Sequence, residues 1–363
     1  MRIIHLLKHG VRGNGHVHVA VDLACAQSDA GHDVVFAAAR SSYTDVLRRH
    51  GVEVVDLPEP QGIKDVPSSA WALARLCRRF RPDVVNAHMM SSAVLAYPIA
   101  KLLGVPLVTT MHNSFDKHSV LMRLGKVVVA VSEAERRLLL SRGYPEHQVV
   151  TIFNGADRSP REGAESDDPP LRRPCVATLS GLHPRKAVSD VITAFSHLAA
   201  EFPDWHLNVI GWGAERERLE LQVAELGLEQ AVHFLGSTPA PRPLLEQADI
   251  FATATLADPC PLTVMEARAA GCAIVATAVG GIPETLDHGG AGQLVPVHDP
   301  GAMAAALRRL MADPVALVDA RARARAGAEY FTVERMSQDY LSLFASLTGL
   351  PADVRSSAET AVR

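Results

Sequence analysis

The sequence predicts an α/β protein that contains two parallel-sheet domains, and two observations carry this prediction. Short apolar runs alternate with helix-length amphipathic stretches along the first 154 residues. After a polar stretch that contains proline and glycine, the same alternation begins again and continues to residue 277. Because helices cover both faces of a parallel sheet, its strands are short continuous apolar runs of this kind.

The expected strands follow one another in the order in which these runs occur. Those of the first domain are IIHLL, HDVVFAA, PDVVNAH, PLVTTMH, KVVVAVS and QVVTIFN. Those of the second domain are CVATLS, HLNVIG, AVHFLG, DIFATA and CAIVAT. We therefore expect a first domain over 1–157, a linker over 158–172 and a second domain over 173–330. A closing helix over 331–350 is expected to pack back toward the first domain, before a flexible tail over 351–363.

Length and composition exclude several classes of protein. The chain has 363 residues, 48% of them apolar, which suggests about two domains with substantial cores. A net charge of -4 disfavours nucleic acid as a partner. Five scattered cysteines favour neither a disulfide framework nor a zinc site, and they fit a reducing cytosol. The N-terminal apolar run is too short for a signal peptide and no stretch suits a membrane span, so we expect a cytoplasmic protein.

The stretch ADPCPLTVMEARAAG, at 257–271, is the first candidate for chemistry. Its helix-forming residues begin after two prolines and end at Gly271, which leaves the amides of Leu262, Thr263 and Val264 without partners inside the helix. Such a helix start binds anions. Asp258 stands in the loop before it and Glu266 about one turn inside. Alternatively, Asp258 begins a turn and Glu266 only complements the helix dipole.

Two further stretches join an expected strand to an expected helix. In LSGLHPRKAV, Arg185 and Lys186 stand just before a helix, where cations suit a departing diphosphate, although a solvated basic turn has the same composition. In HGVRGNGH, the chain turns through glycines that end at Gly15. The fingerprint for a nicotinamide cofactor is incomplete there, because His18 takes the place of its third glycine and no acid ends the second strand.

His88 and His112 each follow an apolar run, so both are expected at the carboxyl edge of the first sheet. Either one is a candidate for the site, and either could instead be a structural histidine with satisfied hydrogen bonds. Of the two, His112 is the preferred candidate.

Taken together, these motifs resemble those of the retaining glycosyltransferases of family 4, which have the GT-B fold. The family carries two glutamates separated by seven residues, and this chain has Asp258 and Glu266 at those positions. The resemblance implies that Asp258 contacts hydroxyls of the transferred sugar and that Glu266 holds the nucleotide ribose. Between them, the amides of Leu262, Thr263 and Val264 would bind sugar and phosphate.

The resemblance assigns roles to the other candidates as well. Lys186 aligns with the lysine of a Lys-Gly pair whose glycine is Ala187 here, and Arg185 is its neighbour. Gly15 would let the backbone approach the donor phosphate, and Gly213 would make room near the nucleotide. His112 would lie near the transferred sugar and the acceptor. His88 would shape the acceptor side.

The implied protein is a pair of Rossmann-like domains facing across a deep cleft, with the acceptor on the first and a UDP- or GDP-linked sugar on the second. It would need no cofactor and no metal, since no D-x-D motif occurs in the chain. Relatives that extend lipid-linked glycans suggest a role in surface polysaccharide or glycolipid synthesis, with peripheral membrane association through arginine clusters at 48–49 and 75–81. A sugar-nucleotide epimerase and a non-catalytic nucleotide-sugar-binding protein remain the alternatives.

Overall fold

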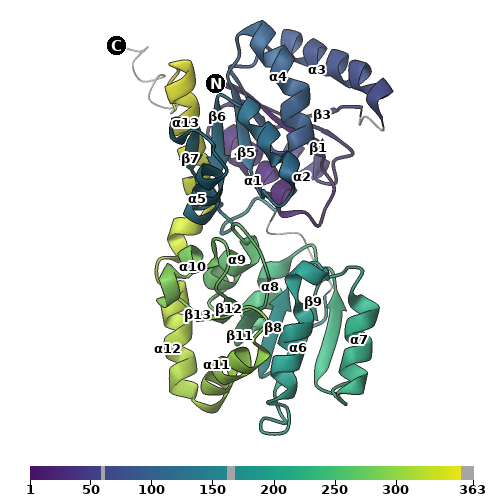
Figure 1. Cartoon of the computed structure of the whole chain (residues 1–363), viewed down its shortest axis with the longest axis vertical. Coiled ribbons are helices and arrows are strands. Elements are labelled where there is room, and N and C mark those ends of the chain that lie inside the picture. Colours follow the sequence, from purple (N-terminus) through teal and green to yellow (C-terminus); the bar gives the residue numbers. More distant parts are fainter. Residues whose placement is uncertain (59–61, 162–167, 353–363) are drawn as a thin grey trace. The chain divides into compact units, whose positions relative to one another are not determined.

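The computed structural model describes residues 1–58, 62–161 and 168–352, which form two compact units (Figure 1). Unit 1 comprises Met1–Pro160 with Thr332–Arg363, and unit 2 is Arg161–Phe331. The chain thus passes between the units inside the stretch expected as a linker, of which 162–167 lie outside the described residues. The expected tail lies outside them from residue 353 onward.

Unit 1 contains a parallel sheet of seven strands in the order β3-β2-β1-β4-β5-β6-β7. The strands are β1 (Arg2–His9), β2 (Asp33–Ala39), β3 (Glu53–Asp56), β4 (Val84–Ala87), β5 (Leu107–Met111), β6 (Val127–Ala130) and β7 (Val149–Thr151). The α-helices are α1 (Gly15–Asp29), α2 (Thr44–Arg49), α3 (Val66–Phe80), α4 (Met90–Leu103), α5 (Glu133–Ser141) and α13 (Val333–Thr348). Short 3-10 helices are η1 (Ile63–Asp65), η2 (Lys117–Leu124) and η3 (Glu146–Gln148).

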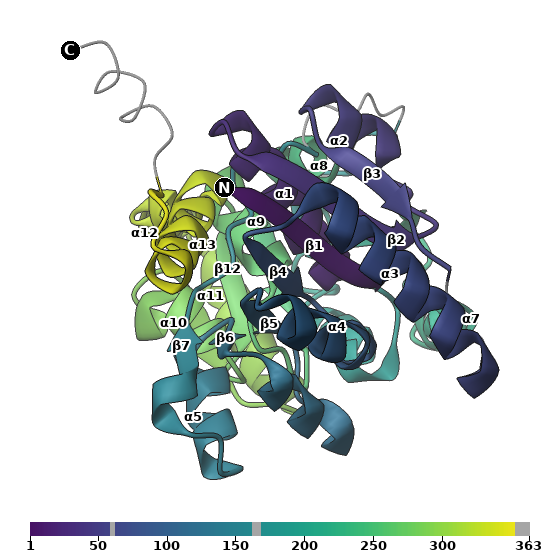
Figure 2. The same ribbon diagram turned by 90° about the horizontal axis from the view of Figure 1, so that it is seen from above.

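Strand β1 sends alternate side chains to opposite faces of this sheet. Ile4 and Leu6 pack in one hydrophobic cluster with Leu73 of α3 and Ala96 of α4. His5 points to the other face, where it meets α1. Figure 2 shows α3 and α4 on one side of β1 and α1 on the other. Helix α13, distant in sequence, packs against α1 and so belongs to the core of unit 1.

Unit 2 contains a parallel sheet of six strands in the order β10-β9-β8-β11-β12-β13. The strands are β8 (Cys175–Leu179), β9 (His206–Ile210), β10 (Val232–Gly236), β11 (Ile250–Thr253), β12 (Ala273–Thr277) and β13 (Gln293–Val295). The α-helices are α6 (Val188–Ser196), α7 (Arg216–Glu225), α8 (Pro241–Gln247), α9 (Leu262–Ala270), α10 (Ile282–Thr285), α11 (Pro300–Ala312) and α12 (Pro314–Arg325). Short 3-10 helices are η4 (Pro184–Lys186), η5 (Asp287–Gly289) and η6 (Ala328–Phe331).

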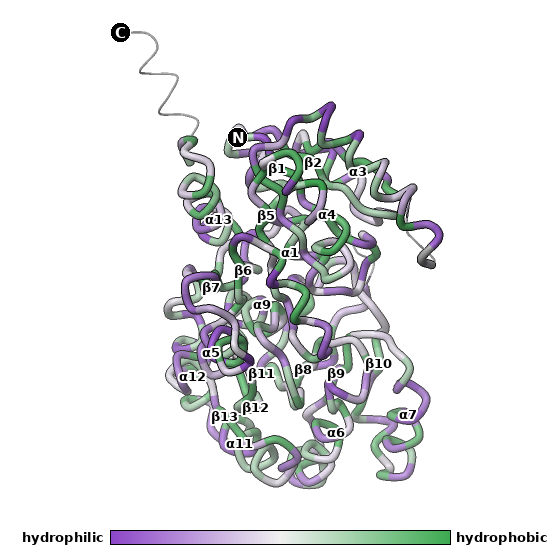
Figure 3. Tube along the Cα trace, turned by 45° about the horizontal axis from the view of Figure 1, so that its top comes forward, coloured by the Kyte–Doolittle hydropathy of each residue, from purple (hydrophilic) through white to green (hydrophobic). Residues whose placement is uncertain are grey.

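The eleven expected strands are all present, and the structure adds β3 and β13, which the sequence patterns did not reveal. Each of these two is the last strand at one edge of its sheet. They are short, and their side chains are mostly only partly buried, so neither needs a continuous apolar run. The contrast with inner strands is visible in Figure 3, where β11 and β12 run through green, hydrophobic segments.

All five cysteines are buried and free of disulfide bonds. Within residues 1–58, 62–161 and 168–352, no helix combines the length and the apolar character that crossing a bilayer requires.

Candidate active site

In each sheet the strand order reverses at one point, and a polar cluster lies there. In unit 1 the chain builds outward from β1 through β2 to β3 and then returns to the other side of β1 with β4. In unit 2 the corresponding reversal lies between β8 and β11. Ligands of open parallel sheets bind at the carboxyl ends of strands at such a switch point. Lys186 follows β8 and Asp258 follows β11, so unit 2 brings two predicted site residues to its switch point.

An ion pair joins these two residues. Lys186 Nζ lies 2.6 Å from Asp258 Oδ2, and both side chains are largely buried, at 20% and 14% exposed. The backbone amide of Cys260 donates to Asp258 Oδ1 over 3.3 Å, and the amide of Gly281 donates to the Asp258 carbonyl over 3.2 Å. Two donors, Nζ of Lys186 and the amide of Cys260, therefore hold the carboxylate, and the amide of Gly281 fixes the backbone of the same residue. The carboxylate presents a fixed hydrogen-bond acceptor beside a cation.

Arg185 fixes the loop that carries Asp258. Its guanidinium donates to the carbonyl of Ala257 over 2.5 Å, and its own carbonyl accepts from the amide of Leu256 over 2.8 Å. The two loops after β8 and β11 are thus tied together by both side chain and backbone. The structure gives Arg185 a positioning contact, whereas the sequence motif suggested only a contact with the donor.

Ala187 has φ +45° and ψ +42°, a left-handed conformation that glycine adopts without strain and alanine does not. The resemblance predicts glycine at this position, and the geometry gives the physical reason. Ala187 ends η4 and precedes α6, so the tight turn that places Lys186 depends on this conformation.

Helix α9 begins at Leu262 and ends with Gly271 at φ +78°. Its N-cap is Pro261, and no side chain caps the first turn, so the amides of Leu262, Thr263 and Val264 depend on other partners. Because the Val264 side chain is fully buried, only its backbone can reach a ligand. The helix therefore presents backbone donors just beyond the loop of Asp258.

The rest of α9 is firmly anchored. Arg268 is fully buried and donates to the carbonyls of Thr285, Ala324 and Ala326. The sequence motif revealed neither this anchor nor Arg161, whose Nη2 lies 3.9 Å from Oε1 of Glu266. Both partners of that loose ion pair are about nine-tenths buried. Glu266, predicted to hold the ribose, thus faces a cation from the stretch that enters unit 2.

The two predicted glycines have different settings. A Cβ on Gly213 would stand 2.2 Å from the carbonyl oxygen of Leu182, so the loop after β8 can pack there only against glycine. This packing explains Gly213 without any ligand. Gly15 is the first residue of α1, directly after its N-cap Asn14, and so lies at the carboxyl edge of the unit 1 sheet.

In unit 1 a row of histidines crosses the switch point. Nδ1 of His5 lies 2.9 Å from Nε2 of His88, and Nδ1 of His88 lies 3.0 Å from Nε2 of His112. At the other end, Nε2 of His5 lies 2.8 Å from Oε1 of Gln27. The predicted residues His88 and His112 are therefore brought together by direct contact. His5 and Gln27 are additional members that the sequence patterns did not single out.

A fourth histidine, His16 in the first turn of α1, lies with its ring centre 5.9 Å from that of His112. Burial lowers the pKa of His5 to about 4, and burial followed by the nearby His9 does the same for His16. Burial is also the main reason why the pKa values of His88 and His112 lie well below 6.5. At neutral pH these rings are therefore uncharged.

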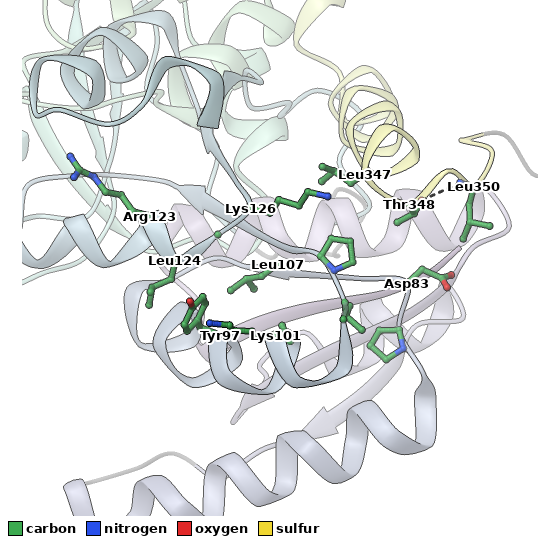
Figure 4. A pocket seen from close by; sticks show the side chains of 16 residues that line it. Asp83, Tyr97, Lys101, Leu107, Arg123, Leu124, Lys126, Leu347, Thr348 and Leu350 are labelled. Atoms are coloured by element: carbon green, nitrogen blue, oxygen red, sulfur yellow. Dashed lines mark hydrogen bonds between the residues drawn. The ribbon is translucent and has the colours of Figure 1, made fainter.

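A separate hollow of about 890 Å³ lies at the opposite edge of the unit 1 sheet (Figure 4). Asp83, Pro106 and Lys126, which precede β4, β5 and β6, are among its lining residues. Lys101 and Arg123 contribute two further cations. None of the predicted site residues lines this hollow.

Among the residues that the structure describes, no three or more His, Cys, Asp or Glu side chains are grouped so that they could hold a metal ion.

Two Rossmann-like units, each with a parallel sheet and a polar cluster at its switch point, define the GT-B class of folds. Family comparison agrees with this class. The model for glycosyl transferases group 1 matches residues 163–329, and the model for glycosyltransferase family 4 matches residues 13–159. The chain therefore belongs to the glycosyltransferases of family 4 and is a glycosyltransferase.

Individual relatives and solved structures agree. The chain is 27% identical to glycogen synthase of Mycobacterium tuberculosis, over 87% of this chain and 86% of that protein. It is also 27% identical to N-acetyl-alpha-D-glucosaminyl L-malate synthase of Bacillus anthracis, over 76% and 77%. Among structures, Anabaena HepE in complex with UDP-glucose has a TM-score of 0.82 at 22% identity, over 95% of this chain and 100% of that one. That likeness establishes the shared fold.

Proposed function

We propose that this glycosyltransferase moves a sugar from a UDP- or GDP-linked donor to an acceptor hydroxyl, with retention of configuration and without a metal ion. The observation that carries the proposal is the buried Lys186–Asp258 pair next to the uncapped start of α9. A cation, backbone amides and a carboxylate in one place match the groups of a nucleotide sugar, which are diphosphate and sugar hydroxyls.

On the donor side, each residue has a distinct task. Lys186 and the amides of Leu262 to Val264 stabilise the diphosphate as its negative charge increases on departure. Asp258 accepts hydrogen bonds from hydroxyls of the transferred sugar, and Glu266 does so from the ribose. Arg185 acts mainly by holding the loop of Asp258 in place. Lys186 and the amides at the start of α9 thus stabilise the departing diphosphate as a bridging metal does in glycosyltransferases of the other major fold.

In the reaction, the bond between the anomeric carbon and the phosphate oxygen breaks, and the diphosphate leaves with the electron pair. The acceptor oxygen then bonds to the anomeric carbon on the same face, and its proton passes to the departing phosphate oxygen. His112 would contact the sugar and the acceptor, and His88 would shape the acceptor side. Gly15, at the start of α1, would let backbone approach the donor phosphate.

The comparisons support this reading of substrate class. HepE has been crystallised with UDP and with UDP-glucose. The relatives are named for acceptors as different as glycogen, malate and phosphatidyl-myo-inositol, so they favour a nucleotide sugar as donor and leave the acceptor open. A role in surface polysaccharide or glycolipid synthesis agrees with the relative named for colanic acid biosynthesis.

A two-stage experiment tests the proposal. UDP- and GDP-sugars are first screened for an increase in melting temperature that grows with ligand concentration. The stabilising donor is then incubated with candidate acceptors, and both nucleoside diphosphate and the anomeric configuration of the product are measured. Diphosphate release that requires an acceptor supports transfer. A donor altered in the absence of acceptor indicates an epimerase, and binding without turnover under every condition indicates a non-catalytic protein.

We also propose that the enzyme associates with the cytoplasmic face of a membrane through α3. This amphipathic helix carries Arg78 and Arg79 in its last turn and exposes 65% of Trp71. A double Arg78→Glu/Arg79→Glu variant should lose sedimentation with anionic vesicles at low salt. Arg308→Glu/Arg309→Glu on α11 is the matched control and should sediment like the parent. If the parent stays in the supernatant at every salt concentration, the association does not occur.

A further inference from the structure

The row of Gln27, His5, His88 and His112 has a direction that follows from elementary hydrogen-bond chemistry. A neutral imidazole carries one N–H and one lone pair, so in a chain of neutral rings each ring donates once and accepts once. The tautomer of one member therefore determines the tautomers of all the others. His5 and Gln27 are fully buried and His88 is 2% exposed, so water does not interrupt the inner part of the chain.

The carbonyl oxygen of Gln27 sets the direction. Because it can only accept, Nε2 of His5 must carry the proton, which leaves Nδ1 of His5 as an acceptor. His88 must then donate from Nε2, and its own Nδ1 accepts from Nε2 of His112. The last ring is left with a lone pair on Nδ1.

We propose that Gln27, His5 and His88 are positioning residues that hold His112 in the tautomer with an unprotonated Nδ1, ready to accept a hydrogen bond from a hydroxyl of the bound substrate. This role rests on the proposed function, since it needs a sugar or an acceptor next to His112. Four segments contribute: β1, α1 and the residues after β4 and β5. This row of hydrogen bonds therefore ties the tautomer of His112, which is partly exposed, to the buried amide of Gln27 on α1.

The low pKa values of the rings support this order, because a protonated ring would donate from both nitrogens and break the sequence of donors and acceptors. Burial keeps the pKa of His5 at about 4. The ring centre of His16 on α1 lies 5.9 Å from that of His112, and the ring centre of His9 on β1 lies 5.8 Å from that of His16. At pH 7 a single arrangement of protons can therefore extend from Gln27 to His112.

The direct test is ¹⁵N NMR of the full chain with labelled histidine, recorded at pH 7 without any nucleotide or sugar. The signal of His112 is assigned as the one that disappears in His112→Gln. We expect its Nε2 to be protonated and its Nδ1 to be unprotonated. The Nε2 of Gln27 has no hydrogen-bond partner among the described residues. The alternative is therefore an amide turned so that this nitrogen, and not Oε1, faces His5. That orientation would reverse every donor in the row and put a proton on Nδ1 of His112, so detection of that proton would overturn the proposal.

A pair of matched variants tests whether Gln27 is responsible. Gln27→Met keeps the size of the side chain and removes its amide, so His112 should become a mixture of both tautomers. The control is Gln222→Met on α7 in unit 2, where the lost amide contacts Ser189 and Thr193 and no histidine. The control should keep the parental spectrum. A parental His112 spectrum in Gln27→Met would overturn the role of Gln27.

Activity provides the second readout. Once a donor is known, Gln27→Met should lower kcat by about tenfold, the value of one net hydrogen bond, while Gln222→Met keeps the parental kcat. If Gln27→Met does not fold, the spectrum of the parent alone still decides the tautomer. That spectrum needs no substrate. If His112 shows the expected tautomer but no sugar is transferred, the proposed function is refuted, while the row of hydrogen bonds from Gln27 to His112 stands.

Discussion

Lowering the pH from 7.5 to 5 should reduce the free energy of unfolding of unit 1 by about 2 kcal/mol through His5 alone. His5 is fully buried, hydrogen-bonded to Gln27 and to His88, and has a pKa near 4 instead of 6.5. The unfolded chain therefore takes up a proton on His5 at a higher pH than the folded chain does. Acid consequently favours the unfolded state.

The magnitude follows from the two pKa values. One unit of pKa difference corresponds to about 1.4 kcal/mol, so lowering the His5 pKa from 6.5 to about 4 represents about 3 kcal/mol. This stability is present in full above pH 6.5 and is lost as the pH falls toward 4. About two thirds of it is lost by pH 5. His16, His88 and His112 have lowered pKa values too, so their effects have the same sign.

Hydrogen exchange of peptides from β1 and β4 measures this quantity for unit 1 separately, after correction for the pH dependence of intrinsic exchange. The perturbation is His5→Gln, which removes the titrating group. Between pH 7.5 and 5 the variant should lose about 2 kcal/mol less stability than the parent. His147→Gln, at an exposed position of η3, is the control and should follow the parent. An unchanged pH dependence in His5→Gln would refute the reasoning.

Three further predictions concern unit 2. Lys186→Ala should lower kcat by about 100-fold, on the order of 3 kcal/mol of lost leaving-group stabilisation, and parental turnover would exclude Lys186 from that role. Ala187→Gly should raise the unfolding free energy by up to about 1 kcal/mol, because relief of the left-handed strain exceeds the entropy that glycine costs; a lower melting temperature would contradict this. Gly213→Ala should destabilise unit 2 by about 2 kcal/mol or more, since its Cβ would stand 2.2 Å from the carbonyl oxygen of Leu182. Gly181→Ala, with its nearest neighbour at 4.0 Å, is the control for that melting experiment and should be tolerated.

The inner strands were predictable because burial on both faces of a sheet requires continuous apolar runs. Runs such as KVVVAVS and CAIVAT meet that requirement, and β6 and β12 are indeed buried along their whole length. Strands β3 and β13 need it less, since an edge strand has a partner on one side only. Their sequences, EVVD and QLV, are too short and too polar for periodicity to distinguish them from loops.

The candidate site was predictable in part, from motifs of neighbouring residues and from the apolar runs that precede His88 and His112. The loop of Asp258 and the start of α9 form one continuous motif, and the sequence alone brings them together. The row of histidines is different, because His5 and His88 are 83 positions apart and meet only once β1 and β4 pair. A histidine inside an apolar strand carries no signal of its partner. The order of strands in the sheet supplies that information.

The replacement of the family glutamate by Asp258 is best understood from the loops around it. A Cβ on Gly280 would stand 1.9 Å from the carbonyl oxygen of Asp258, so this close approach of two loops requires glycine. The amide of Gly281 donates to the same carbonyl and fixes the backbone of Asp258. With the backbone held there, the short carboxylate already reaches Nζ of Lys186 at 2.6 Å. A glutamate would carry its carboxylate one methylene further from this fixed backbone. The shorter acid therefore matches the position of Lys186.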